Sequence, residues 1–207
     1  MGDYESGYER RLPDPVKNVQ VTQIDWEACM TIPENQWGYH KDWSLSYVKT
    51  PQELLEMLTL TTSLGGNFLL NFGPQGDGAI RPEEKQIATA IGDWMKLNGE
   101  AIYGGDYAGW KKQDWGYYIR KAGTNKVYMV VFNQPVGGIA RLQVPDKVKI
   151  SKSYFLDAPS QSLQLKETQK NQFNLYLPPA KKTGPYIIVL ETVTGDKEGP
   201  AYQEAKT

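Results

Sequence analysis

Hydrophobic patterns typical of helices and of strands alternate along the chain before Gly104, and beyond it apolar residues recur at every second position. A first helix is expected after "TPQE" at residues 50–53, which has the form of a capping box with proline at the first helical position. Its apolar side would consist of Leu54, Leu55, Leu58 and Thr62. Gly65 and Gly66 follow this pattern, so the helix is predicted to stop before them.

A short strand and a second helix come next. The run "NFLLNF" at residues 67–72 lies between glycines and predicts a strand that is buried on both faces, as in parallel sheets. The glycine-rich "GPQGDG" predicts a loop. A second helix is expected from Pro82, because Glu83 and Glu84 would lie near its positive end. Gly99 is predicted to close it, and its buried stripe would be Ile87, Ile91, Trp94 and Met95.

Beyond Gly104 the pattern is that of short strands. The segment "WGYYIRKAGTNKVYMVVFN" predicts a hairpin whose turn is "AGTN". Further short strands are expected at "ARLQV", "KSYFL", "SLQLKE", "FNLYL" and "YIIVLETV". Strands of this length and spacing indicate a small antiparallel sandwich. The segment from Gly195 onward is polar and is predicted to be a tail.

The composition excludes several classes of function. With a formal net charge of −1 over 207 residues, the chain has no electrostatic basis for binding nucleic acid or an acidic membrane surface. One cysteine, Cys29, and one histidine, His40, cannot form an internal disulfide or a metal site of the usual His/Cys type. No run reaches the roughly 18 apolar residues of a membrane span. No metal or cofactor is therefore expected.

The first half contains too few elements to complete its own sheet. Only one convincing strand–helix unit and the end of another can be recognised, whereas a parallel α/β architecture needs several such units. A lone buried strand would leave its backbone groups without partners. We therefore expect the chain to be the C-terminal part of a larger protein, whose missing part lies before Met1.

Four motifs in order carry a resemblance to a known family. "GDYESGYERR", "WEACMTIPENQWGYH", "GGNFLLNFGPQGDGAIRPEE" and "IGDWMKLNGEAIYG" resemble, over about residues 2–110, the C-terminal portion of a glycoside hydrolase family 29 α-L-fucosidase of the bacterial, Bacteroides type. The resemblance implies an α/β plus all-β fold. Residues 1–104 would be the C-terminal end of a (β/α)8-like catalytic barrel, residues 105–195 an antiparallel β-sandwich and residues 196–207 a polar tail.

The same resemblance implies a retaining exo-glycosidase that hydrolyses terminal α-linked L-fucose from oligosaccharides or glycoprotein glycans. Such enzymes use two carboxyl groups about 5–5.5 Å apart. The family's nucleophilic aspartate, its fucose-binding histidine pair and an arginine have no match in this chain. We therefore expect the chain alone to be inactive without an N-terminal barrel half. The resemblance implies a periplasmic or secreted enzyme. The alternative function is a non-catalytic carbohydrate-binding or structural β-sandwich module.

The resemblance identifies Glu9 as the general acid/base, because it follows the pair Asp3 and Tyr4 by several residues in a loop after a barrel strand. Glu5 is the alternative, and both glutamates could instead be solvated loop charges. A neighbouring cation lowers the pKa of a carboxylate, whereas a general acid needs a raised one. Arg10 and Arg11 are thus expected to point away from Glu9, unless the loss of the nucleophile's charge in the covalent intermediate matters less than this reasoning assumes.

Trp37, in "ENQWGYH", is the second site residue that the resemblance implies. The family has an aromatic residue here, packed against the C5 methyl group and apolar face of fucose. Burying that methyl group is worth roughly 1 kcal/mol. The alternative for Trp37 is core packing. His40 could hydrogen-bond the substrate, but a lone histidine is more often structural.

Overall fold

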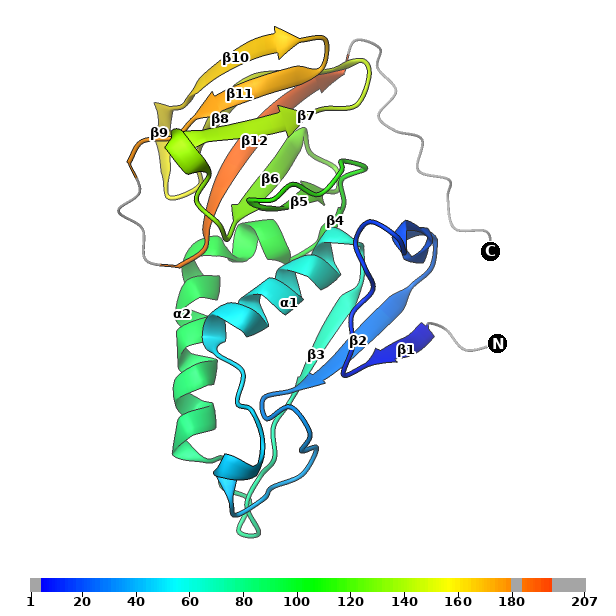
Figure 1. The fold of residues 1–207 in the computed structure, drawn as a ribbon, viewed down its shortest axis with the longest axis vertical. Coiled ribbons are helices and arrows are strands. Elements are labelled where there is room, and N and C mark those ends of the chain that lie inside the picture. Colours follow the sequence, from blue (N-terminus) through cyan, green and yellow to red (C-terminus); the bar gives the residue numbers. More distant parts are fainter. Residues whose placement is uncertain (1–4, 180–183, 195–207) are drawn as a thin grey trace.

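The computed structural model describes residues 5–179 and 184–194, which form mostly sheet with few helices (Figure 1). Three parallel strands make the first sheet in the order β1–β2–β3, and they span Glu5–Glu9, Trp26–Thr31 and Asn67–Asn71. Short 3-10 helices η1, Val19–Gln23, and η2, Trp43–Leu45, lie in the connections. The expectation that Glu9 lies in a loop is wrong, because Glu9 is the last residue of strand β1.

The first helix, α1, spans Pro51–Ser63 and has the capping box that the sequence predicts. The Glu53 backbone N–H donates to Thr50 Oγ1 over 3.3 Å, and the Thr50 N–H donates to Glu53 Oε2 over 2.8 Å. Gly65 follows the helix at φ +73°, a conformation that favours glycine. The helix packs against one face of the parallel sheet. The shared core contains Val21, Trp26, Ala28, Met30 and Leu64, with Tyr8, Met57, Leu60, Phe68 and Leu70 partly buried around it.

The second helix, α2, begins at Pro82 as predicted but runs to Ile102, so the predicted end at Gly99 is wrong. Gly99 lies buried inside the helix, where the Tyr103 ring packs on it; a Cβ there would come within 2.9 Å of Tyr103 Cε2. The glycine therefore permits close packing, and the chain turns only at Gly104, with φ +64°.

The rest of the chain forms two antiparallel sheets, in the orders β4–β5–β6–β12–β8–β9 and β10–β11–β7. The predicted hairpin is confirmed, with its turn at residues 122–125. In chain order the strands span Gly105–Tyr107, Gly116–Lys121, Lys126–Val131, Ile139–Gln143, Val148–Phe155, Ala158–Ser162, Gln164–Gln169, Gln172–Tyr176 and Tyr186–Thr194; a 3-10 helix, η3, spans Val136–Gly138.

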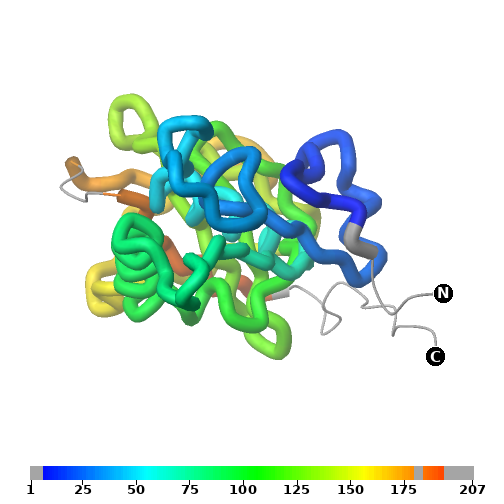
Figure 2. Tube along the Cα trace, turned by 90° about the horizontal axis from the view of Figure 1, so that it is seen from below, coloured from blue at the N-terminus to red at the C-terminus, as the bar shows by residue number. Residues whose placement is uncertain are grey.

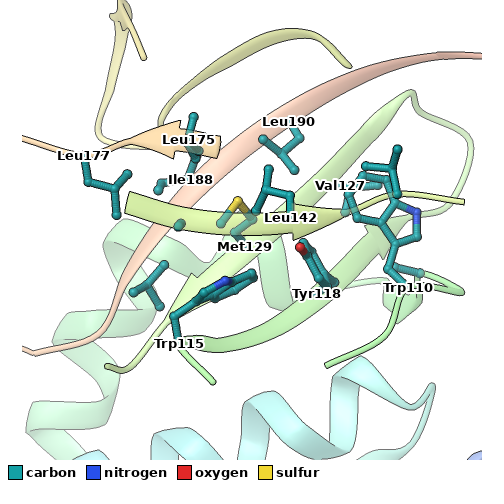
Figure 3. Packing of buried hydrophobic residues seen from close by; sticks show 14 of the residues in the cluster. Trp110, Trp115, Tyr118, Val127, Met129, Leu142, Leu175, Leu177, Ile188 and Leu190 are labelled. Atoms are coloured by element: carbon teal, nitrogen blue, oxygen red, sulfur yellow. The ribbon is translucent and has the colours of Figure 1, made fainter. Parts of the chain in front are cut away.

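The six-stranded sheet is covered on both faces. One face meets the three-stranded antiparallel sheet, β10–β11–β7, across a core that includes Tyr118, Met129, Leu142, Leu175 and Leu190 (Figure 3). The other face meets the helices through Ala101, Ile102, Ile119, Tyr128, Val130, Ile187 and Val189. Trp94 Nε1 of α2 also donates to the Pro185 carbonyl oxygen over 2.7 Å.

The parallel sheet differs, because only its α1 side is packed. Leu69 in β3 is 48% exposed, so the prediction that this strand is buried on both faces is wrong for this chain. The polar tail predicted at residues 196–207 lies outside the described residues. Among the described helices, none combines the length and apolar character needed to cross a membrane.

Candidate active site

The carboxyl ends of the three parallel strands, at Glu9, Thr31 and Asn71, meet at one edge of the sheet. The connections that leave β2 and β3 lie together at the end of the molecule farthest from the antiparallel sheets (Figure 1), and Figure 2 views the molecule from below, toward this end. Ligands of open α/β sheets bind outside the carboxyl ends of the strands. A binding or catalytic site is therefore expected at this edge.

Glu9 lies on the open face of the sheet. The strand register places Glu9 opposite Cys29, and Cys29 opposite Leu69. Neighbours on each strand alternate between faces, and Tyr8 packs edge-on against Trp26 on the α1 side, with ring centroids 5.1 Å apart. The Glu9 side chain is accordingly exposed on the opposite side.

The charges on this open face act on the Cys29 thiol. Partial burial raises the pKa of Cys29, and the negative charges of Glu27 and Glu9 raise it further. Cys29 is thus held in its protonated form. The strand register places Glu9 opposite Cys29 and Glu27 two residues before Cys29 on β2.

The two arginines that follow Glu9 have partners other than its carboxylate. The Arg11 guanidinium donates from Nε and Nη2 to the Gly7 carbonyl oxygen, over 3.1 and 2.9 Å. The Arg10 guanidinium lies over the ring of Trp37, with Cζ 5.7 Å from the ring centroid. Within residues 5–179 and 184–194, no ion pair involves Glu9.

A turn immediately after Glu9 holds Arg10 in this position. Arg10 has φ +52°, which is uncommon for a residue with a side chain. Its backbone N–H donates to the Cys29 carbonyl oxygen over 2.9 Å, which ties the turn to β2. The turn therefore connects Glu9 to Arg10, whose guanidinium lies over the ring of Trp37.

Trp37 is half-buried and fixed from its other side by the end of β3. Asn71 Nδ2 donates to the Trp37 carbonyl oxygen over 2.6 Å. The next connection also touches this segment, because a Cβ added to Gly73 would lie 2.8 Å from the Gly38 carbonyl carbon. A glycine at position 73 thus allows the two connections to pack backbone to backbone.

Arg81, the residue before α2, also contacts the connection that carries Trp37. Its Cζ lies 4.9 Å from the ring centroid of Tyr39 and 4.4 Å from that of Trp43. Its Nη2 donates to the carbonyl oxygen of His40. The His40 ring contacts the backbone of Asp42, at 3.1 Å to its oxygen and 3.2 Å to its nitrogen, so the structural interpretation of His40 fits its surroundings.

A buried lysine fixes the start of the same connection. Lys49 is only 4% exposed; its Nζ donates to the Thr31 carbonyl oxygen over 2.9 Å and lies 2.6 Å from Glu34 Oε2. The charge of Lys49 is therefore paired at the point where β2 ends.

Glu84 is buried beneath the β3–α2 connection. Its Oε1 accepts a long hydrogen bond of 3.4 Å from the Gly73 N–H, and its Oε2 has no hydrogen-bond partner among the described residues. Burial raises the pKa of the Glu84 carboxyl group; the Gly73 hydrogen bond and then the charge of Arg81 lower it, and Glu83 raises it. Burial is the largest of these effects, so the pKa of the carboxyl group is raised overall.

Sequence reasoning predicted Glu9 and Trp37 as site residues but did not foresee the contacts of Arg10 and Asn71 with Trp37, or those of Arg81 with the same connection. The one available signal was a polar residue, Asn71, at the carboxyl end of an apolar strand. In the part of the chain that the structure describes, no group of three or more His, Cys, Asp or Glu side chains could hold a metal ion.

Comparison with known proteins gives consistent results. The sequence model of the α-L-fucosidase family matches residues 1–100. Human tissue α-L-fucosidase is 36% identical over 134 residues, and human plasma α-L-fucosidase is 32% identical over 160 residues. These matches cover 64% and 74% of this chain but only 28% and 33% of the human proteins, so the chain spans about a third of their length.

Solved structures match nearly the whole chain. A family 29 α-L-fucosidase from Bacteroides thetaiotaomicron is 53% identical, with a TM-score of 0.91, over 100% of this chain and 45% of that one. A Glu→Gln mutant from the same organism, trapped as a covalent intermediate with 2-fluoro-fucosyl fluoride, is 55% identical, with a TM-score of 0.90, over 94% and 44% of the two chains. α-L-Fucosidase isoenzyme 1 from Paenibacillus thiaminolyticus is 27% identical, with a TM-score of 0.78, over 93% and 45%.

Proposed function

Since this chain belongs to the α-L-fucosidase family, we propose that it carries the general acid/base and part of the fucose pocket of a retaining α-L-fucosidase. Such an enzyme releases terminal α-linked L-fucose from oligosaccharides or glycoprotein glycans. The observation that carries this proposal is the position of Glu9. It ends a parallel strand on the open face of its sheet, and the next residue, Arg10, lies over the Trp37 ring.

The architecture that we propose has two folded parts. Residues 1–104 form the C-terminal end of a (β/α)8-like catalytic barrel, residues 105–195 a β-sandwich domain and residues 196–207 a polar tail. The open face of β1–β3 supports this division, because barrel strands carry side chains on an inner face that other strands cover. The nucleophilic aspartate would come from barrel strands outside these 207 residues.

In the first chemical step, the proposed nucleophile attacks the anomeric carbon of fucose. Glu9 donates its proton to the glycosidic oxygen as the carbon–oxygen bond breaks, and the sugar alcohol leaves. In the second step, Glu9 takes a proton from water while the water oxygen attacks the anomeric carbon, which releases fucose and restores both carboxyl groups. The engagement of Arg10 and Arg11 elsewhere supports this role, because a cation paired with Glu9 would oppose its protonated form.

Glu9 fits this role better than Glu5. Glu5 begins β1 and Glu9 ends it, and sites of α/β sheets lie at the carboxyl ends of strands. The covalent intermediate trapped in the Bacteroides thetaiotaomicron Glu→Gln mutant supports a glutamate-assisted covalent mechanism for the family.

Trp37 supplies the apolar part of the pocket in this proposal. Its indole would pack against the C5 methyl group of fucose, which is worth roughly 1 kcal/mol. Because Arg10 stacks on Trp37 and Asn71 holds its carbonyl oxygen, the ring is positioned before substrate arrives. Such preorganisation reduces the ordering that binding requires.

The test uses a chimeric enzyme in which residues 1–207 replace the matching part of the Bacteroides thetaiotaomicron fucosidase. The chimeric enzyme should hydrolyse α-L-fucosides. Glu9→Ala should slow cleavage of a fucosylated oligosaccharide by about 10²–10⁴-fold, because its poor leaving group needs protonation. Cleavage of an activated aryl fucoside should be slowed less by the same substitution. Equal losses on both substrates would contradict the assignment of Glu9 as the acid.

A non-catalytic carbohydrate-binding or structural module is the second candidate for the chain taken alone. The extensive core of the antiparallel sheets favours it, because that region is packed without help from the parallel sheet's open face. The isolated 207-residue chain should show no fucoside hydrolysis under this or the preceding proposal. Turnover by the isolated chain would contradict the need for an external nucleophile.

A further inference from the structure

An exposed aromatic ring lies next to the proposed fucose pocket. Tyr39 is 41% exposed and comes two residues after Trp37, so their Cα atoms are at most about 7 Å apart. Resting on the proposed function, we propose that Tyr39 is the platform of an acceptor subsite. The ring would stack against the sugar to which the fucose is attached, namely the leaving group of the reaction.

The Tyr39 ring is held in place from one side. Arg81 lies over it at 4.9 Å from the centroid and lies over the Trp43 ring at 4.4 Å. The same guanidinium donates to the His40 carbonyl oxygen, which fixes its orientation. Arg81 thus lies over the Tyr39 ring, while the residue as a whole remains 41% exposed.

The backbone under Tyr39 is fixed as well. A Cβ added to Gly73 would lie 2.8 Å from the Tyr39 nitrogen, which shows how closely the β3–α2 connection supports it. Two residues earlier in the same connection, the Trp37 carbonyl oxygen accepts a hydrogen bond from Asn71 Nδ2. A ring that is already ordered loses little conformational entropy when a ligand binds.

The chemistry of the platform defines its ligand class. An aromatic ring that is apolar on its face and polar at its hydroxyl suits the C–H face and hydroxyl rim of a neutral pyranose. The cation behind the ring disfavours a cationic ligand. The ligand is accordingly a neutral pyranose, the sugar that bears the fucose.

The experiment compares two substrates of the chimeric enzyme. A fucosylated disaccharide fills the acceptor subsite, whereas α-L-fucosyl fluoride carries no sugar there. Tyr39→Ala should lower kcat/KM for the disaccharide by about five- to tenfold more than for the fluoride. Tyr39→Phe, which keeps the ring, should preserve the wild-type ratio of the two values. Arg81→Ala should shift that ratio in the same direction as Tyr39→Ala, because the ring loses its support.

Tyr47 provides the matched control. It is 59% exposed in the same connection, but its hydroxyl donates to the Glu53 carboxylate at the start of α1. Tyr47→Ala should leave the ratio of the two kcat/KM values unchanged. Equal losses on both substrates in Tyr39→Ala, or no loss on either, would overturn the acceptor subsite while leaving the fucosidase proposal intact. A chimeric enzyme that hydrolyses neither substrate would overturn the proposed function, and the subsite with it.

Discussion

The six-stranded antiparallel sheet and the three-stranded parallel sheet differ in how completely the chain covers them. In β6, Val127–Val131 are all buried, because one face meets the second antiparallel sheet and the other meets the helices. In the parallel sheet, only the face toward α1 is packed, and Leu69 remains 48% exposed. Glu9 and Cys29 share that open face. The candidate chemistry thus lies where the chain leaves its own sheet open.

A matched pair of leucines gives the largest expected contrast. Leu190 is 0% exposed in the six-stranded sheet, and Leu69 lies on the open face of β3. Leu190→Ala should lower the free energy of unfolding by about 2–5 kcal/mol, because it leaves a cavity. Leu69→Ala should cost about 0.5–1 kcal/mol. Urea unfolding of the 207-residue chain measures both.

Equal losses for the two leucines would mean that the face of β3 is covered, which contradicts the comparison. The chimeric enzyme sharpens the test. Leu69→Ala should cost more there than in the isolated chain, because the remaining barrel strands would then cover Leu69. An unchanged cost would argue against the proposed barrel.

A pair of glycines in the β3–α2 connection gives the next largest effect. A Cβ at Gly73 would lie 2.8 Å from the backbone of Gly38, whereas a Cβ at Gly76 would meet nothing within 4 Å. Gly73→Ala should lower the free energy of unfolding by about 1–3 kcal/mol, because backbone must move to make room. Gly76→Ala should change it by less than about 0.5 kcal/mol.

The same glycine pair also tests the link to function. Displacing Gly38 would disturb Trp37, so Gly73→Ala should reduce kcat/KM of the chimeric enzyme while Gly76→Ala should not. Thermal unfolding and fucosyl fluoride hydrolysis, measured on both variants, provide the check. Similar kinetics in the two variants would show that the packing of these connections does not position Trp37.

Glu84 gives the smallest expected effect, through pH. Its pKa is raised by burial, so the unfolded state ionises at lower pH than the folded state. Its contribution to stability is complete below the unfolded pKa of about 4.3 and is lost as pH rises through the folded pKa. Glu84→Gln cannot ionise and should avoid this loss, so its stability relative to wild type should grow with pH.

Thermal unfolding at a series of pH values from 4 upward measures that difference. The charged groups that act on the Glu84 carboxyl are Arg81, which lowers its pKa, and Glu83, which raises it. Glu83→Gln, on the exposed side of the same turn, is the control for the loss of a charge at this helix end. A stability difference between Glu84→Gln and wild type that does not change with pH would contradict the raised pKa.

Local signals predicted the elements that local interactions determine. The capping box at Thr50 and the turn at residues 122–125 depend on neighbours in sequence, and both are confirmed. Strand β1 was missed, because "ESGYE" has no apolar run and becomes a strand by pairing with β2. Gly99 was misread as a helix end, because its role comes from packing against Tyr103.

The residues of the candidate site also fall into those that the sequence indicates and those that depend on contacts in the folded chain. Glu9 and Trp37 came from family motifs, which record residue types at fixed positions. Arg10 and Arg81 act through rings distant in sequence, so no local pattern could identify them. The exposure of Tyr39 is likewise a property of the folded connection and not of the sequence around it.

The most direct test of the central claim is azide rescue of Glu9→Ala in the chimeric enzyme. Azide needs no deprotonation, so it can attack the covalent intermediate without the missing base. With an activated aryl fucoside, azide should accelerate Glu9→Ala and give α-L-fucosyl azide, because two inversions retain configuration. Glu5→Ala should be neither slowed nor rescued. Rescue of Glu5→Ala alone, or of neither variant, would contradict the assignment of Glu9 as the acid/base.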